Sequence, residues 1–268
     1  MELLKPILLG VLQGATEFLP VSSSGHLVLA ETFFHIQQAG IAFDVALHMG
    51  TLLAIVLYFR LDLLAISGAL LRLGSEDQLV RGNQRLALLL IVATIPAAVI
   101  GKLYGDQIEE HLRQPAWIAA TLAGVGLILL VAEKIGSRRR AFHEMTMVDA
   151  LVIGLAQATA LVPGVSRSGI TMTTALFRDL DRTASARFSF LMSAPIIAGA
   201  GLLHLVKILR QGFPPSQEGF FVAGFLASAI SGYLFISFLM RYLQSRSFAI
   251  FAYYRVALAA VVVWTMVR

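Results

Sequence analysis

The sequence lacks cysteine and is poor in charged residues. With no cysteine among its 268 residues, the chain cannot form disulfides, use a cysteine nucleophile or bind a metal through thiolates. Charged residues make up only 14% of the chain and hydrophobic residues 57%, against about 25% and about 45–50% in a soluble domain. This composition excludes a disordered chain and a water-soluble monomer, and it predicts a membrane protein.

Acidic residues are fewer than basic ones, which gives a net charge of +5. In a soluble protein this excess would suggest nucleic-acid binding, but in a membrane protein it is explained by Lys and Arg in cytoplasmic loops. We therefore expect no nucleic-acid partner. The opening residues, MELLKPILLG, lack the basic region and the cleavage site of a secretory signal, so we expect them to belong to the mature protein.

Six apolar runs approach the length of a membrane-spanning helix, and only the last contains a charge, Arg255. They are residues 45–59, 86–101, 114–132, 188–206, 219–240 and 247–267. Two further apolar segments, residues 2–36 and 147–180, are interrupted by Pro, Gly and Ser. Non-helical backbone at membrane depth must be buried in protein, so these segments predict re-entrant helix–loop–helix pairs. The expected fold class is therefore all-α: a polytopic integral membrane protein with six spanning helices and two re-entrant pairs.

The distribution of Lys and Arg predicts the orientation of the chain. Thirteen of the 21 Lys and Arg residues fall in four loops that we place on the cytoplasmic side, and six fall on the other side. These four loops are residues 60–85, 134–146, 178–187 and 241–246. Both termini then lie outside, the first re-entrant pair enters from outside, and the second enters from the cytoplasm. Such an arrangement is an inverted repeat.

An internal repeat supports this arrangement. Residues 10–25 align without gaps with residues 154–169, and six of the 16 positions are identical, mostly at Gly, Gln and Ser. We therefore divide the single membrane domain, residues 1–268, into repeat halves 1–135 and 146–268. Inverted repeats with broken helices place a binding site near the middle of the membrane, where the repeats meet.

Gln13 and Glu17 are four residues apart on a predicted helix, so their side chains share one face. A carboxylate and an amide oxygen together suit a hard cation such as Mg²⁺ or Ca²⁺. Alternatively, the pair forms hydrogen bonds to a neighbouring helix. The two residues alone do not decide between these interpretations.

The first interrupted segment contains Ser22, Ser23, Ser24, Gly25 and His26 ahead of a new helix. Unpaired N–H groups at a helix N-terminus attract anions, and a hydroxyl-rich turn with Gly allows phosphate to approach the backbone. His26 could serve as a general acid or base. Helix capping is the structural alternative, but it requires only one of the serines.

The second interrupted segment repeats this pattern and adds a cation. It contains Ser166, Arg167, Ser168, Gly169 and Thr171. Arginine is well suited to two-point recognition of phosphate or carboxylate. The structural alternative is an ion pair between Arg167 and an acidic side chain, Glu17 or Asp44, which a substrate could displace.

Three further polar residues at membrane depth receive a structural interpretation. Asp44 and His48 are four residues apart and predict a local polar pair. Arg255, beside Tyr253 and Tyr254, is expected to snorkel to the interface or stack on an aromatic ring.

These segments resemble the undecaprenyl-diphosphate phosphatase family, also called the bacitracin resistance family. The family shows an (E/Q)-x-x-x-E motif, here Gln13 to Glu17, followed by P-V-S-S-S/T-G-H, here Pro20 to His26. It also shows P-G-x-S-R-S-x-x-T, here Pro163 to Thr171. The resemblance covers the whole chain. Gln in place of Glu at position 13 fits the family pattern but removes a formal charge.

The resemblance implies an integral plasma-membrane enzyme of bacteria that removes the terminal phosphate from undecaprenyl diphosphate and so recycles the lipid carrier of cell-wall synthesis. It implies dependence on Mg²⁺ or Ca²⁺ and an active site that faces the periplasm or the cell exterior. The expected partners are a long-chain prenyl diphosphate and membrane lipids, and a homodimer is left open.

From the residues and the resemblance together we derive a set of roles. Arg167 clamps the diphosphate, Glu17 with Gln13 holds the cation, and His26 transfers a proton. The nucleophile is water or a serine hydroxyl, with Ser23 preferred. The substrate is bound by Ser22, Ser24, Gly25, Ser166, Ser168, Gly169 and Thr171.

Two other classes of protein share some of these features. An inverted repeat with broken helices is also typical of secondary transporters and would suit a lipid flippase. Serine and glycine turns near a histidine also suit an intramembrane serine protease. A protease, however, needs neither an arginine beside its nucleophile nor an acidic metal motif.

Overall fold

A computed structural model describes residues 3–34, 41–211 and 218–267 of the chain. These residues contain eleven α-helices, one short 3₁₀ helix and no strand apart from an isolated bridge between Arg140 and Leu180. In chain order the helices are α1 (Leu4–Phe18), α2 (Ser23–Phe34), α3 (Ile41–Tyr58), α4 (Arg60–Leu70), α5 (Gln78–Leu112), α6 (Pro115–Ile135), η1 (Phe142–Glu144), α7 (Met147–Thr159), α8 (Arg167–Phe177), α9 (Arg182–Gln211), α10 (Glu218–Tyr242) and α11 (Ala249–Val267). The all-α class is confirmed.

Five of the described helices are long and apolar enough to cross a membrane. They are α5, α6, α9, α10 and α11. Helix α3 counts as a sixth span only when it is taken together with α4, and the chain bends by 78° between the two helices. The bend falls where Arg60 and Asp62 follow the apolar run, and these charges favour leaving the hydrocarbon layer. The prediction of a polytopic membrane protein is therefore confirmed, with five spans or six if the bent pair counts as one.

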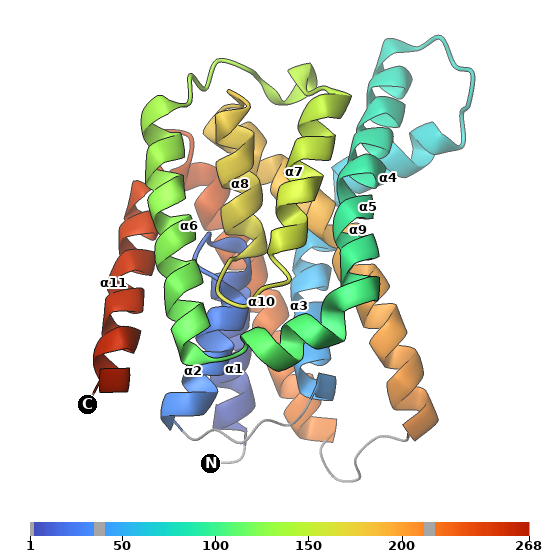
Figure 1. Cartoon of the computed structure of the whole chain (residues 1–268). Helices are drawn as coiled ribbons and strands as arrows, with labels where there is room; N and C mark the ends of the chain where they lie inside the picture. The colour runs from blue at the N-terminus through green and yellow to red at the C-terminus, as the bar shows by residue number, and fades with distance from the viewer. Residues whose placement is uncertain (1–2, 35–40, 212–217, 268) are drawn as a thin grey trace.

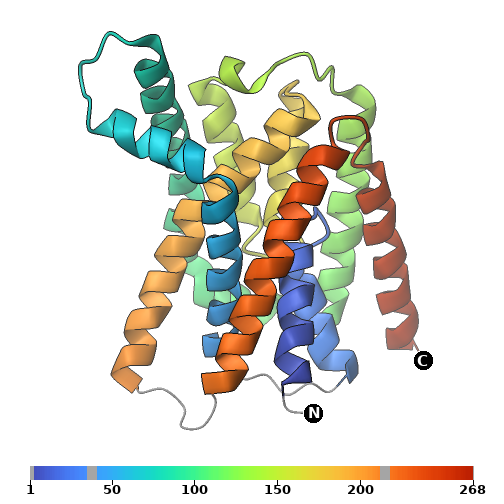
Figure 2. The ribbon, with the colours of Figure 1, turned by 180° about the vertical axis from the view of Figure 1, so that it is seen from behind.

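The two interrupted segments form helix–turn–helix pairs that enter the bundle from opposite ends. In Figures 1 and 2 both termini lie at one end, and α1 and α2 rise from that end to a turn inside the bundle. Helices α7 and α8 descend from the other end to a second turn at a similar depth. The structure thus has the arrangement expected of re-entrant pairs. Residues 2, 35 and 36 of the first predicted segment lie outside the described residues, and the division into halves 1–135 and 146–268 stays a prediction.

Glycines at matching positions of the repeat bring each pair close to a spanning helix. A Cβ atom at Gly10 of α1 would collide with the carbonyl oxygen of Gly224 on α10. Gly154 is the position of α7 that aligns with Gly10, and a Cβ atom there would collide with the backbone of Ala93 on α5. Small residues allow close helix packing where burial against lipid provides no driving force. The matched glycines therefore serve the same packing role in both halves.

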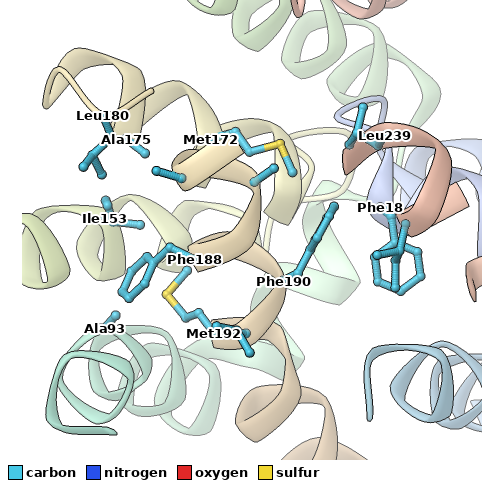
Figure 3. Close-up of a cluster of buried hydrophobic side chains, with 14 of the residues drawn as sticks. Phe18, Ala93, Ile153, Met172, Ala175, Leu180, Phe188, Phe190, Met192 and Leu239 are labelled. Carbon is cyan, nitrogen blue, oxygen red and sulfur yellow. The ribbon is translucent and has the colours of Figure 1, made fainter. Parts of the chain in front are cut away.

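The largest buried apolar cluster lies between the turns and the cytoplasmic end predicted from the sequence. Figure 3 shows Phe18 of α1 beside Phe190 of α9, and their rings pack edge to face at 5.4 Å. Phe188 and Met172 belong to the same cluster. Large apolar side chains are also exposed along α5, α6, α10 and α11, which is expected of surfaces that face lipid. The cluster fixes α8 and α9 around the end of α1.

Ion pairs hold the basic loops at the opposite end from the termini. The carboxylate of Glu133 on α6 pairs with Arg138 and Arg182, at 3.0 and 2.8 Å. Nearby, the side chain of Asp179 accepts a hydrogen bond of 2.9 Å from the amide of Ser137, and hydrogen bonding to Ser137 lowers the pKa of Asp179. These contacts fasten the end of α6 to the segment between α8 and α9, far from either terminus.

Candidate active site

The first turn places a new helix N-terminus inside the bundle. Helix α1 ends at Phe18, Pro20 lies in the turn, and α2 begins at Ser23. Ser22 adopts a left-handed backbone with φ of 78°, and its hydroxyl accepts a hydrogen bond of 3.2 Å from the amide of Gly25. A non-glycine residue in this conformation is strained, and such strain tends to occur at functional sites.

The second turn has the same local geometry. Ser166 aligns with Ser22 in the repeat, has φ of 74°, and accepts a hydrogen bond of 3.0 Å from the amide of Gly169. The capping interpretation of the first turn is therefore confirmed for Ser22, and Ser166 caps α8 in the same way. It does not apply to Ser23 and Arg167, which align with each other and begin α2 and α8. The repeat thus places a hydroxyl and a guanidinium at equivalent positions.

The carboxylate of Glu17 is the point at which the two turns meet. Its side chain is buried, and Arg167 lies 3.3 Å from one of its oxygens. The other oxygen accepts hydrogen bonds from the hydroxyl of Ser23 at 2.6 Å and the amide of Gln13 at 3.1 Å. The structure therefore brings together four of the residues selected from the sequence. The ion pair expected as an alternative role for Arg167 is present.

A histidine interpreted as structural also reaches this carboxylate. The Nε2 atom of His48 lies 3.9 Å from Glu17, while its Nδ1 atom is 2.8 Å from the carbonyl oxygen of Asp44. This contact is with the backbone of Asp44, so the predicted pairing of the two side chains stays a prediction. The contact with Glu17 was missed, because nothing in the sequence relates α3 to α1 in space.

His26 points to a different neighbour. Its Nδ1 atom lies 2.7 Å from the carbonyl oxygen of Ser22, and its Nε2 atom lies 2.7 Å from the hydroxyl of Tyr254, on which the ring stacks. The bond to a carbonyl makes Nδ1 the donor, so Nε2 of the neutral ring accepts from the tyrosine. The structure thus orients His26 toward α11, and its role in proton transfer stays a prediction.

The remaining hydroxyls divide into buried and accessible groups. The hydroxyl of Ser168 lies 3.1 Å from the carbonyl oxygens of both Glu17 and Leu19, which share its one proton, so it ties the start of α8 to the first turn. Thr171 donates to the carbonyl oxygen of Arg167 at 2.7 Å and is fully buried. Ser24, in contrast, is exposed. Serine 168 and Thr171 therefore support the geometry of the site, and their predicted substrate contacts stay predictions.

A cavity of about 310 Å³ opens beside Arg167. Asp44, His48 and Gln157 supply its other polar lining, and the rest is mainly Ala, Val, Leu and Ile from α3, α5, α7 and α9. Two buried atoms of this lining, Oε1 of Gln157 and Nη1 of Arg167, have no hydrogen-bond partner among the described residues. Gln157 was not selected as a site residue, although its alignment with Gln13 in the repeat was a usable signal.

The residues proposed to hold a cation fit such a ligand. Oε1 of Gln13 is buried and has no hydrogen-bond partner within the described part of the chain, so an acceptor is free beside the Glu17 carboxylate. Within the described part of the chain, no group of three or more His, Asp or Glu side chains is arranged to hold a metal ion. Two oxygen ligands from the protein suit Mg²⁺, which often keeps waters and binds substrate phosphates for its remaining ligands.

Arg255 is the clearest departure from the sequence interpretation. It was expected to snorkel or stack, but its side chain is fully buried and donates hydrogen bonds to five backbone carbonyls. The snorkelling interpretation was wrong. Because α11 packs against α6 and the two turns, the guanidinium finds hydrogen-bond acceptors in their backbones and does not have to reach the membrane interface.

The fold and site together define a class: a polytopic helical membrane protein in which two broken helices bring a carboxylate, a serine and an arginine to one interior site. A family profile described as "Bacitracin resistance protein BacA" matches residues 6–261. The chain belongs to this family.

Curated relatives match the chain along almost its full length. The protein named undecaprenyl-diphosphatase from Rubrobacter xylanophilus is 52% identical over 265 residues, which cover 98% of this chain and 97% of the relative. Proteins of the same name from Moorella thermoacetica and Pelobacter propionicus are 46% and 44% identical, each over 98% of this chain and 97% of the relative. The sequence similarity therefore extends over almost the whole length of these proteins.

Proposed function

We propose that this protein hydrolyses undecaprenyl diphosphate to undecaprenyl phosphate and inorganic phosphate, and so returns the lipid carrier to cell-wall synthesis. The names of its relatives support this substrate. The observation that carries the proposal is the contact of Arg167 and Ser23 with Glu17 at the meeting point of two helix N-termini. Such a site combines a guanidinium, backbone N–H groups and a hydroxyl, which are groups that can bind and transfer a phosphoryl group.

Arg167 binds the diphosphate in this scheme. Its side chain is 22% exposed, and its Nη1 atom has no hydrogen-bond partner among the described residues. A partly buried guanidinium stabilises the charge that spreads over the phosphoryl oxygens during transfer. The N-terminal turns of α2 and α8 add backbone N–H groups to the same anion.

Glu17 prepares the nucleophile. The 2.6 Å hydrogen bond from Ser23 aligns the serine hydroxyl with a carboxylate that can accept its proton, and the same carboxylate can orient a water molecule. We prefer Ser23, because its hydroxyl already makes this contact. In that case the terminal phosphoryl group passes to Ser23 and then to water.

We also propose that Gln13 and Glu17 hold a Mg²⁺ or Ca²⁺ ion. When bound, such an ion would neutralise charge on the diphosphate. The free Oε1 atom of Gln13 supports this proposal.

The prenyl chain would occupy a second, apolar cavity of about 720 Å³ between α3, α9 and α10. Its lining includes Met49, Phe221 and Phe225, and it shares Val45 and Gly201 with the polar cavity. The diphosphate and its chain could therefore lie in adjoining spaces, as a lipid substrate requires.

We further propose that the site faces the exterior of a bacterial plasma membrane. The fewer Lys and Arg residues at the end with the termini support this orientation. Asp44, in the first turn of α3, lines the polar cavity, and α3 begins toward that end of the bundle (Figure 1). Assembly into a homodimer stays a prediction.

Phosphate release from a long-chain prenyl diphosphate, measured with purified protein in detergent, tests the proposed function. We expect release that EDTA abolishes and that Arg167→Ala lowers by about 10³-fold, because that variant loses the transition-state contact. Arg246→Ala, at an exposed arginine between α10 and α11, is the matched control and should retain activity. No release by folded protein, with several lipids and cations, would contradict the proposal and favour the transporter alternative.

A further inference from the structure

Arg255 lies outside every motif of the site, yet it is the largest fully buried side chain in the described part of the protein. Within that part, its hydrogen-bond partners are all backbone carbonyls, and no carboxylate forms an ion pair with it. Burying a guanidinium without a counter-ion lowers the free energy of unfolding, because the charge loses its hydration. An apolar side chain of similar size could fill the same space. The charge and the hydrogen-bond donors of Arg255 must therefore serve something other than packing.

The guanidinium bonds to both turns at once. Its Nη1 atom donates to the carbonyl oxygen of Pro20 in the first turn, at 3.1 Å. Its Nη2 atom donates to the carbonyl oxygens of Gly164 and Val165 in the second turn, at 2.8 and 3.0 Å. One rigid, planar group therefore fixes the separation of the two turns.

The same side chain is anchored to a spanning helix. Its Nε atom donates to the carbonyl oxygen of Leu122 on α6 at 3.1 Å, and Nη2 also reaches Thr121 at 3.3 Å. The hydroxyl of Thr121 in turn donates to the carbonyl oxygen of Pro163 at 2.8 Å. Both turns are thus held against α6, which gives the site a fixed frame.

Glycine lets the start of α8 approach Arg255 closely. A Cβ atom at Gly169 would lie 3.0 Å from Nη1 of Arg255, and Gly164 adopts φ of 90°, which favours glycine. The first turn of α8 therefore packs directly on the guanidinium.

The charge of Arg255 has an electrostatic consequence. It lies beside the turn before α2 and the first turn of α8, where the helix dipoles are already positive. Five carbonyl oxygens offset part of the cost of burying this charge. The charge also adds to the positive potential at the two helix N-termini, which favours an anion bound there.

We propose that Arg255 is a positioning residue that sets Ser23 and Arg167 at their working separation and adds its charge to the field that holds the diphosphate. Ser23 and Arg167 directly follow the two turns that Arg255 fixes, so a shift of either turn moves one of them relative to Glu17. This inference rests on the proposed function, because it assigns the anion to that site.

Two variants separate the two parts of the proposal. Arg255→Lys keeps the charge but loses the planar fork, and Arg255→Gln loses both. We expect both to lower kcat by about 100-fold, because a misplacement of about 1 Å in a reacting group can cost that much. Only Arg255→Gln should also raise KM severalfold, because it alone removes the charge.

Arg182→Lys and Arg182→Gln are the matched controls. Arg182 also bonds its helix, α9, to α6, but it does so through Glu133 at the opposite end of the bundle. These variants should lower the melting temperature without changing kcat or KM. Helical content and gel filtration establish that each variant is folded.

A binding measurement keeps this inference distinct from the proposed function. Inorganic pyrophosphate should raise the melting temperature of the wild-type protein and of Arg255→Lys, but raise it less in Arg255→Gln. If the wild-type protein binds pyrophosphate but hydrolyses no prenyl diphosphate, the proposed function fails while the electrostatic part of the inference stands. Wild-type kinetics in a folded Arg255→Gln variant would overturn the inference. Loss of folding in both Arg255 variants, with both Arg182 variants folded, would also overturn it, by making Arg255 a residue of folding alone.

Discussion

The two interior turns have one backbone design and carry different chemistry. Ser22 and Ser166 have the same left-handed conformation and cap the same position of the following helix. The next residue is Ser23 in one turn and Arg167 in the other. Two turns can therefore keep the residues that give them the same shape while one carries a hydroxyl and the other a guanidinium.

The helices before the turns differ in the same way. Gln13 has its counterpart in Gln157, but Glu17 aligns with the apolar Leu161. Of the two interrupted segments, only the first therefore supplies this carboxylate, and only the second supplies the arginine that pairs with it. Neither segment holds a complete site, so the site exists only where the two turns meet. The following predictions test this division between shared framework and separate chemistry.

Among the substitutions, the largest effect should come from Ser23→Ala. If the serine hydroxyl is the nucleophile, kcat should fall by about 10³-fold or more, since removal of a nucleophile removes the covalent step. Rapid acid quenching of wild-type protein with a labelled terminal phosphate should trap phosphoserine. Ser245→Ala, at an exposed turn after α10, is the control. Full activity in Ser23→Ala would instead make water the nucleophile.

Changing the cation ligands should give the next largest effect. EDTA should abolish activity, and Mg²⁺ or Ca²⁺ should restore it. Gln13→Glu adds a second carboxylate beside Glu17, so half-maximal activity should need a lower cation concentration. The repeat-related change Gln157→Glu should leave that concentration unchanged, because Leu161 lies where a second ligand would be required. Equal responses in a metal titration of both variants would contradict the assignment of the cation to the first half.

The adjoining apolar cavity should affect long substrates selectively. Ala46→Trp fills part of this cavity, so kcat/KM for a C55 diphosphate should fall by about tenfold, a typical penalty for a poor fit in an apolar pocket. A C15 diphosphate, which needs less of the cavity, should be hydrolysed almost normally. Ala120→Trp, on an exposed face of α6, is the matched control. Equal losses of kcat/KM for both substrates would indicate that the prenyl chain does not bind in this cavity.

The smallest effect should come from the caps that the two turns share. Ser22→Ala and Ser166→Ala each remove one capping bond, so each should lower the stability of the protein by about 1 kcal/mol. Because the local geometry is the same, the two losses should be similar in thermal unfolding experiments in detergent. A large effect of one variant and none of the other would show that the turns are not equivalent in energy.

Much of the site could be predicted from local sequence. The polar residues of each turn stand out against an apolar background, and Gln13 and Glu17 share a face at helical spacing. Long-range contacts could not be predicted in this way. His26 and Tyr254 are separated by 228 positions, and their contact depends on how α11 packs. The approach of His48 to Glu17 likewise depends on the placement of α3 against α1.

The sequence alone determined the membrane class, the two broken helices and the residues at their turns, because hydrophobicity and backbone preference act over a few neighbouring positions. Tertiary structure decided which of these residues meet. It paired Arg167 with Glu17, turned His26 toward α11 and buried Arg255 beneath both turns. These outcomes depend on close packing of helices that are far apart in the chain, since a buried polar group must find its partners wherever the packing places them.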